Sequence, residues 1–232
     1  MIEVRHAAER GATRLDWLDS RHSFAFGEYW DPAHSGFGPL RVINEDRVAP
    51  GAGFPAHGHR DMEILTWVLD GALAHRDSLG SGAVLRPGEL QRMTAGSGIR
   101  HSEFNASAAA PVHFLQIWIQ PERAGLAPGY DQRAFDGDEI RDRLRLVASR
   151  DGRSGSLSLA RDADVYAARL TAGATLTHPL AAGRRAWLQV AHGRVRVGDT
   201  WLAAGDGAAI TGERLVTITA EADAEVLLFD LA

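Results

Sequence analysis

The sequence of 232 residues predicts an all-β protein with little helix, and three observations carry this prediction. Short apolar or alternating runs recur along the chain, as expected for half-buried and buried strands. Turns that contain glycine separate these runs and supply the positive φ that tight hairpins need. Helical periodicity is scarce and is confined to residues 138–146. This combination is typical of a β-sandwich or β-barrel.

Six runs are the clearest predicted strands, and they occur in both halves of the chain. They are Leu40 to Asn44, Ile64 to Leu69, His113 to Ile119, Trp187 to Ala191, Leu215 to Thr219 and Val226 to Phe229. Three dipeptides, each joining two apolar runs, are predicted as hairpin turns. They are Asp70-Gly71, His192-Gly193 and Gly198-Asp199.

The two halves of the chain share a coarse plan of an approach strand, a hairpin and a glycine-centred turn into another strand. The first half shows it in GAGFPAHGH, ILTWVLDGALAHRD and RPGELQRM, and the second in AGATLTHPL, AWLQVAHGRVRVGD and AAGDGAAI. Between them, residues 120–137 are rich in Pro, Gly and charge and do not alternate, which indicates a crossing between domains. We therefore expect a duplicated barrel, with domains at residues 1–125 and 126–232.

Composition narrows the classes of partner and cofactor. The 25 basic side chains are all Arg and are scattered among 30 acidic ones, so no nucleic acid partner is indicated. Cysteine is absent, so disulfides are excluded and a metal ion would be held by nitrogen and oxygen. No run approaches the roughly 18 apolar residues of a membrane span, and the N-terminal segment lacks a signal-peptide pattern. A cytoplasmic protein without a membrane partner is expected.

Two short motifs indicate a metal site in the first half. His57 and His59 are two residues apart, which on a strand places both imidazoles on one face, and His101 and Glu103 repeat that spacing with a carboxylate. If the two strands face each other in a barrel, three nitrogens and one oxygen converge. This set suits one divalent transition metal, namely Fe, Ni, Cu, Co, Mn or Zn. Four protein ligands leave room for water or substrate, so the predicted site is of the catalytic type.

The spacing of these motifs resembles that of the cupin superfamily. The two cupin-like motifs are Gly51-x5-His57-x-His59-x3-Glu63, followed by Gly71, and Gly98-x2-His101-x3-Asn105. More specifically, LRVINEDRVAPGAGFPAHGHRDMEILTWVLDG and LRPGELQRMTAGSGIRHSEFN resemble the bacterial pirin-like proteins. RHSFAFGEYWDP and AWLQVAHGRVRVGDTWLAAGDGAAI fit the same family, so the resemblance covers nearly the whole chain.

The pirin resemblance implies a bicupin, in which two jelly-roll-like barrels (double-stranded β-helices) carry a metal only in the N-terminal barrel. The implied ligands are His57, His59, His101 and Glu103. The usual cupin carboxylate corresponds instead to Glu63, so the sequence leaves a choice between two carboxylates, and the pirin pattern selects Glu103. The second barrel offers only His178-Pro179 at the corresponding place and is expected to be metal-free.

Some bacterial pirins are quercetin 2,3-dioxygenases, which cleave a flavonol with O2 and release carbon monoxide. The resemblance thus implies a small flavonol-like substrate, with the metal activating its 3-hydroxyl oxygen and Glu103 as the candidate base. Other pirins are described as cofactors of transcription regulators, so the alternative is a non-catalytic regulatory module that acts through protein partners. A third alternative is metal-dependent chemistry on another small enol, because a fold does not determine a function. A monomer is expected.

Further side chains are candidates to line the pocket or to hydrogen-bond to the ligands. They are Glu63, Phe24, Phe26, His22 and His113, with His34, Phe37, Trp30 and Trp118 as weaker candidates. Four other histidines rank lower because a lone histidine is more often packed or exposed. They are His6, His75, His178 and His192.

Overall fold

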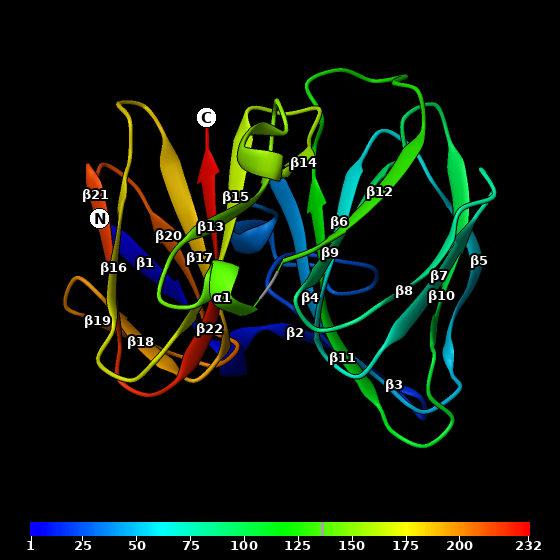
Figure 1. Cartoon of the computed structure of the whole chain (residues 1–232), viewed down its shortest axis with the longest axis horizontal. Helices are drawn as coiled ribbons and strands as arrows, with labels where there is room; N and C mark the ends of the chain where they lie inside the picture. The colour runs from blue at the N-terminus through cyan, green and yellow to red at the C-terminus, as the bar shows by residue number, and fades with distance from the viewer. Residues whose placement is uncertain (136) are drawn as a thin grey trace. The chain divides into compact units, whose positions relative to one another are not determined.

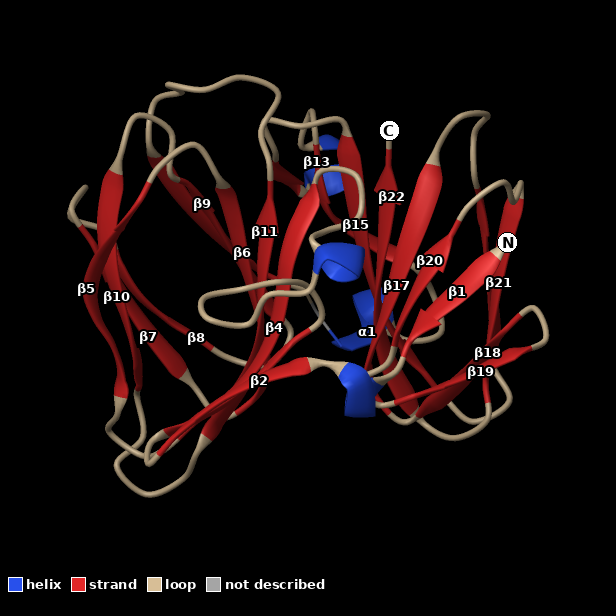
Figure 2. Cartoon of the chain, turned by 180° about the vertical axis from the view of Figure 1, so that it is seen from behind, coloured by secondary structure: helices blue, strands red, loops and turns tan. Residues whose placement is uncertain are grey.

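The computed structural model describes residues 1–135 and 137–232, and β-strands make up nearly all of its regular secondary structure (Figures 1 and 2). It divides into two compact units. The N-terminal unit comprises Gly11–Ala134 and Leu159–Arg161, and the C-terminal unit comprises Met1–Arg10, Phe135–Ser158 and Asp162–Ala232. Each unit contains one seven-stranded and one four-stranded sheet, which confirms the predicted all-β class.

The larger sheet of the N-terminal unit has the strand order β12-β9-β6-β11-β4-β3-β2, and the smaller has the order β5-β10-β7-β8. The strands of the larger sheet are β2 (Gly11–Leu15), β3 (Leu18–His22), β4 (Leu40–Val48), β6 (Glu63–Asp70), β9 (Glu89–Thr94), β11 (Val112–Ile119) and β12 (Gly129–Ala134). Those of the smaller sheet are β5 (Gly53–His59), β7 (Leu73–Asp77), β8 (Gly82–Leu85) and β10 (Ile99–Asn105). A 3₁₀ turn at Pro32–His34 precedes β4.

The C-terminal unit repeats this plan, with orders β1-β20-β17-β22-β15-β13-β14 and β16-β21-β18-β19. Its larger sheet contains β1 (Ile2–Arg5), β13 (Arg145–Ser149), β14 (Leu157–Ser158), β15 (Ala163–Leu170), β17 (Arg185–His192), β20 (Gly207–Ile210) and β22 (Ala224–Leu231). Its smaller sheet contains β16 (Thr175–Pro179), β18 (Arg194–Val197), β19 (Thr200–Ala203) and β21 (Leu215–Ala220). The short helical segments are Ala7–Glu9, α1 (Gly137–Ile140) and Arg153–Gly155.

The interiors of the two units differ in polarity. The C-terminal unit has an aliphatic core that includes Leu188, Val190, Ile218 and Leu228, all fully buried. The N-terminal unit has a smaller apolar cluster around Val48 and Phe114. It also buries Thr66 and Gln91, which hydrogen-bond to each other, and Thr66 bonds as well to the partly buried Gln116. Because buried polar groups are tolerated when they are hydrogen-bonded, this polar interior is compatible with a stable barrel.

The predicted strands and hairpin turns are confirmed by the structure. Each of the six predicted runs lies within an observed strand. The three predicted turns join β6 to β7, β17 to β18, and β18 to β19. Their glycines, Gly71, Gly193 and Gly198, have φ values of 78°, 75° and 56°. A residue with a Cβ rarely adopts this conformation, which explains why glycine stands at these turns.

Two expectations about chain organisation differ from the structure. Residues 120–137 contain β12, which pairs with β9 at the edge of the sheet. An edge strand with half-exposed side chains shows no clear alternation, so its pairing is hidden in the sequence. Residues 1–10 lie in the C-terminal unit, since β1 pairs with β20, whereas the sequence pattern places them in the first barrel.

The predicted helix at residues 138–146 is largely wrong. Only Gly137–Ile140 is helical, and β13 begins at Arg145. Leu146 pairs with Tyr166 on β15, so strand pairing with a distant segment overrides the local periodicity. None of the helices that the structure describes has the length or the apolar character of a membrane span.

We expect Gly193→Ala to destabilise the protein more than Gly183→Ala does. Both glycines have positive φ, 75° and 83°, so both variants bear the left-handed backbone penalty of about 1–2 kcal/mol. A Cβ at Gly193 would lie 2.1 Å from the carbonyl oxygen of Asp223, whereas one at Gly183 would meet nothing within 4 Å. Urea unfolding should therefore give an additional loss of about 2 kcal/mol for Gly193→Ala. Equal stabilities would contradict the close approach at this turn.

Candidate metal centre

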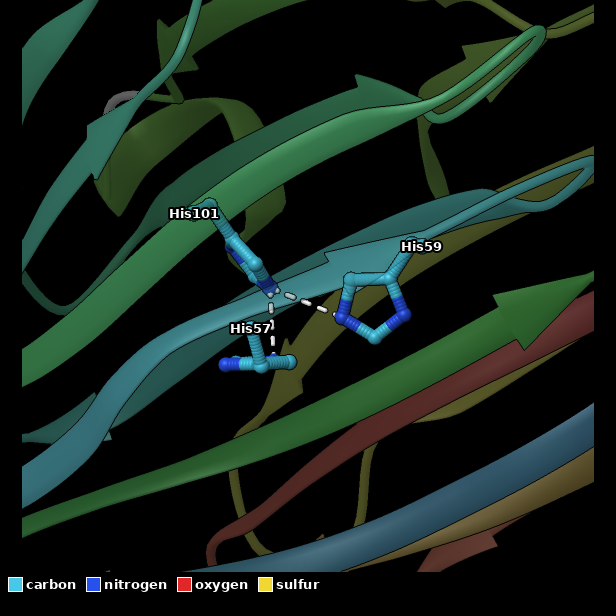
Figure 3. Close-up of side chains that lie close together, drawn as sticks. All are labelled: His57, His59 and His101. Atoms are coloured by element: carbon cyan, nitrogen blue, oxygen red, sulfur yellow. Dashed lines mark hydrogen bonds between the residues drawn. The ribbon is translucent and has the colours of Figure 1, made fainter.

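Three imidazoles converge inside the N-terminal unit (Figure 3). Strands β5 and β10 are antiparallel, and their register sets His57 opposite His101. The Nε2 atom of His101 lies 2.9 Å from Nε2 of His59 and 3.0 Å from Nε2 of His57. The three ring centroids are 4.5 to 4.8 Å apart. The predicted grouping of these histidines is therefore realised in space.

His59 and His101 are neutral, which is the form that binds metal ions. Burial, together with the neighbouring histidines, lowers the pKa of His101 to about 2, and burial together with His57 lowers the pKa of His59 to about 4. Nδ1 of His57 lies 2.8 Å from the carbonyl oxygen of Pro55. A carbonyl can only accept, so Nδ1 carries the proton and Nε2 presents its lone pair to the site. This donor set fits a divalent transition metal.

Glu103 lies on β10 two residues after His101, and its carboxylate is within 4.8 Å of the ligand atoms of His75 and His101. The register between β10 and β5 shifts between His101 and Glu103, where β5 contains one additional residue. The carboxylate is fully buried, with Oε2 2.8 Å from Nε2 of Gln116 and Oε1 3.4 Å from Oγ1 of Thr66. Burial, reinforced by nearby Asp46, raises the pKa of Glu103 to about 7. The site therefore holds a carboxyl group that is able to exchange a proton near neutral pH.

A second group of metal-ligand side chains overlaps the first. His75, His101 and Glu103 each offer one ligand atom, and these atoms lie within 4.8 Å of one another. His75 is buried on β7, and its Nε2 lies 3.1 Å from Oδ2 of Asp77. His75 ranked low in the sequence because it is a lone histidine there. The spacing of His75 and Asp77, two residues apart on one strand face, is the signal that could have identified it.

Comparisons with known proteins agree with this geometry. The family model described as Pirin matches residues 3–119. A second model, described as the quercetinase C-terminal cupin domain, matches residues 146–231. The chain belongs to the pirin family. The match of the C-terminal half to a cupin domain agrees with the cupin-type barrels expected from the sequence.

Pirin-family relatives match the chain along its full length. A "Quercetin 2,3-dioxygenase" from Escherichia coli K12 is 46% identical over 231 residues, covering 100% of this chain and 99% of that protein. The crystal structure of YhhW from E. coli has a TM-score of 0.96 and 46% identity, covering 100% of this chain and 98% of that one. The structure of bacterial pirin YhhW in complex with nickel(II) has a TM-score of 0.95 and 46% identity, with 100% and 99% covered.

In this pirin-family chain, the C-terminal unit lacks the corresponding arrangement among its described residues. His178 on β16 pairs in register with Val216 on β21, whereas the equivalent strands of the N-terminal unit pair His57 with His101. Nε2 of His178 donates to Oδ2 of Asp230 at 2.8 Å. An apolar residue therefore stands where the second motif would supply an imidazole.

Glu63, the other carboxylate considered from the sequence, lies at the start of β6 and outside both groups of ligand atoms in the described chain. It is fully buried, and its Oε2 accepts a hydrogen bond from Oγ1 of Thr94 at 3.1 Å. Its Oε1 has no hydrogen-bond partner. Burial raises the pKa of Glu63, against the opposing effect of Thr94 and Arg92.

The other predicted pocket residues divide into two groups. His22 and His113 are held in polar contacts: Nδ1 of His22 is 2.8 Å from Oδ1 of Asn44, and Nε2 of His113 is 2.9 Å from Oε1 of Glu45. Phe24 is a buried core residue, 2% exposed. Phe26 contacts Trp118 edge-on with ring centroids 5.5 Å apart, and Trp118 contacts His59 at 5.0 Å. Trp118, a weaker candidate in the sequence, therefore forms the aromatic wall beside the histidines.

A surface hollow is lined in part by His59. It has a volume of about 390 Å³ and is lined by His59, Arg60, Ser78, Ile99 and Arg100 together with Gly58 and Gly98. Both β5 and β10 contribute to it.

We expect Glu63→Gln to become more stable relative to the wild type as pH rises above 4.5. Burial raises the pKa of Glu63 above its ordinary value of 4.5, so folding favours the protonated carboxyl. The stability that the protonated form contributes is present below that value and is lost as pH rises through the folded pKa. Urea unfolding of both proteins across this pH range measures the difference, with Glu9→Gln on the surface as control. A pH-independent difference would contradict the burial of an ionisable Glu63.

Proposed function

We propose that the chain is a metal-dependent dioxygenase of the pirin type that cleaves flavonols such as quercetin with O2. The observation that carries this proposal is the convergence of the Nε2 atoms of His57, His59 and His101. Further support comes from the 46% identity to the E. coli "Quercetin 2,3-dioxygenase" and from the nickel(II) complex of a pirin of equal identity.

The proposed metal ligands are His57, His59, His101 and Glu103. Glu103 is preferred to Glu63 because its carboxylate lies within 4.8 Å of the ligand atom of His101, whereas Glu63 belongs to neither group of ligand atoms. Three imidazoles and one carboxylate accept Fe, Ni, Cu, Co, Mn or Zn, so geometry and availability select the ion.

The proposed chemistry begins with the 3-hydroxyl group of the flavonol. A bound ion supplies Lewis-acid chemistry that favours the ionised form of this hydroxyl. We assign Glu103 as the group that takes the proton at a carboxylate oxygen, which is the role of a general base. Gln116 and Thr66 hold the two oxygens in place. Because ligation and proton transfer compete for one carboxylate, the proton goes to an oxygen not committed to the ion.

The surroundings of the site suit a planar aromatic substrate. Trp118 and Phe26 present ring surfaces next to His59, and aromatic rings pack favourably against other aromatic rings. His101 and Glu103 are 2% and 1% exposed, so these two side chains are shielded from bulk water. Exclusion of water strengthens the electrostatic interactions within the site.

We expect His101→Ala to lose stoichiometric metal, because it removes the imidazole that contacts both other histidines. His113→Ala is the matched control: it removes a carboxylate-paired histidine of the same unit that belongs to neither ligand group. Glu103→Gln should bind the metal more weakly than the wild type, and Glu63→Gln should keep it. Elemental analysis after dialysis measures the content. Full retention in a His57→Ala/His101→Ala double variant would show that the ion is held elsewhere.

We expect the wild-type protein, purified anaerobically and reconstituted with one metal at a time, to consume O2 and release carbon monoxide with quercetin. Glu103→Gln should lower kcat about 100-fold or more, the usual contribution of a general base. Inactivity of the Fe, Ni, Cu, Co and Mn forms, despite bound metal, would overturn the proposed activity. That outcome would favour the alternative of a regulatory metal-binding module that acts through protein partners.

A further inference from the structure

A buried histidine and a buried aspartate lie on the strand next to two of the proposed ligands. On adjacent strands β7 and β10, His75 is the register partner of Glu103, and Asp77 is the register partner of His101. The side chains of His75 and Asp77 are both fully buried. Neighbours in register on one sheet face have Cβ atoms about 5 Å apart, so the pair lies in contact range of the ligands.

Asp77 determines which nitrogen of His75 carries the proton. Its Oδ1 accepts the backbone amides of Leu79 at 2.9 Å and Ser81 at 3.0 Å, and its Oδ2 lies 3.1 Å from Nε2 of His75. Those amides and His75 keep the pKa of Asp77 low although burial opposes them. A carboxylate only accepts hydrogen bonds, so Nε2 of His75 donates and its Nδ1 presents a lone pair. The ring of Tyr130 stacks on His75 at 4.6 Å and holds its plane.

His75 and His101 each have one buried nitrogen without a partner. In both cases it is Nδ1, and neither atom has a hydrogen-bond partner in the structure. Nε2 of His101 points to the other two histidines, so with Nε2 on a metal ion, the proton of this ring resides on Nδ1. His101 therefore presents a buried donor and His75 a buried acceptor. An unpaired buried polar atom is unfavourable. A hydrogen-bonded link from Nδ1 of His101 to Nδ1 of His75 would satisfy both atoms.

We propose that His75, held by Asp77, is a positioning residue that accepts the Nδ1 hydrogen bond of His101 through one water molecule, since the two ring centroids lie 5.4 Å apart and their Nδ1 atoms are not in direct contact. This inference rests on the proposed function, because it requires His101 to bind the metal through Nε2. The hydrogen bond orients the ring of His101 and makes Nε2 a better donor. The carbonyl of Pro55 has the same role for His57. The hydrogen-bonded series Asp77–His75–His101 thus connects a fixed carboxylate to the metal centre.

The first test uses zinc alone as the probe. His75→Phe keeps a ring that can stack on Tyr130 but removes the acceptor, and we expect zinc to bind 10- to 100-fold more weakly in competition with a chelator. His75→Gln, whose amide can donate to Asp77 and accept from His101, should bind more tightly than His75→Phe. His113→Phe is the matched control, because His113 is also paired with a carboxylate in the same unit and should leave zinc affinity unchanged.

The second test needs no variant. In the zinc-loaded wild-type protein, ¹⁵N NMR of the histidine rings should place the proton of His101 on Nδ1 and that of His75 on Nε2. X-ray absorption should count three imidazole ligands in both the wild type and His75→Phe. The opposite tautomer at either ring, or zinc affinity of His75→Phe equal to that of the wild type, would overturn the inference. So would loss of an imidazole ligand in His75→Phe, since His75 would then bind the ion itself.

The two proposals fail in different ways. If His101→Ala retains zinc at wild-type affinity, the metal site itself is wrong, and the proposed function fails with it. If His101→Ala loses zinc while His75→Phe binds it as tightly as the wild type, the metal site stands and only the role of His75 fails.

Discussion

The register between β5 and β10 is the constraint on which the rest of the site depends. It sets His57 opposite His101, and the two-residue spacing on each strand then turns His59 and Glu103 to the same face. A shift of one residue would turn one of these motifs to the opposite face of its strand. The register of the two strands shifts between His101 and Glu103, and the additional residue lies on β5. The pairing of these two strands thereby brings together the Nε2 atoms of three histidines from separate segments of the chain.

The same architecture encloses two different interiors. In the N-terminal unit, β6 and β11 pair Thr66 with Gln116, and in the C-terminal unit the strands at the same places in the sheet pair Leu188 with Leu228. The polar pair hydrogen-bonds at 2.9 Å and also reaches Glu103, whereas the leucines belong to an aliphatic core. The fold therefore tolerates either interior, and the side chains alone create a site.

Burial and hydrogen bonding act together on the proposed metal centre. Burial keeps His59 and His101 neutral, which is the form that binds a metal ion. Burial also raises the pKa of Glu103 to about 7. Both effects are in place before a substrate arrives. Hydrogen bonds supply the orientation, through Pro55 for His57 and through Gln116 and Thr66 for Glu103. The proposed part of His75 extends this principle to His101, whose remaining nitrogen is otherwise an unpaired buried donor.

The sequence by itself determined six of the strands, three glycine hairpins and the two motifs, because strand period and turn conformation depend on neighbouring residues. It also carried the pirin resemblance along nearly the whole chain. The tertiary structure alone decided that β1 joins the C-terminal unit, that β12 is a strand, and that His75 lies on the strand next to His101. It also decided which carboxylate lies next to the histidines, since Glu63 and Glu103 have equal chemistry. These results depend on pairing between distant segments, which no local pattern encodes.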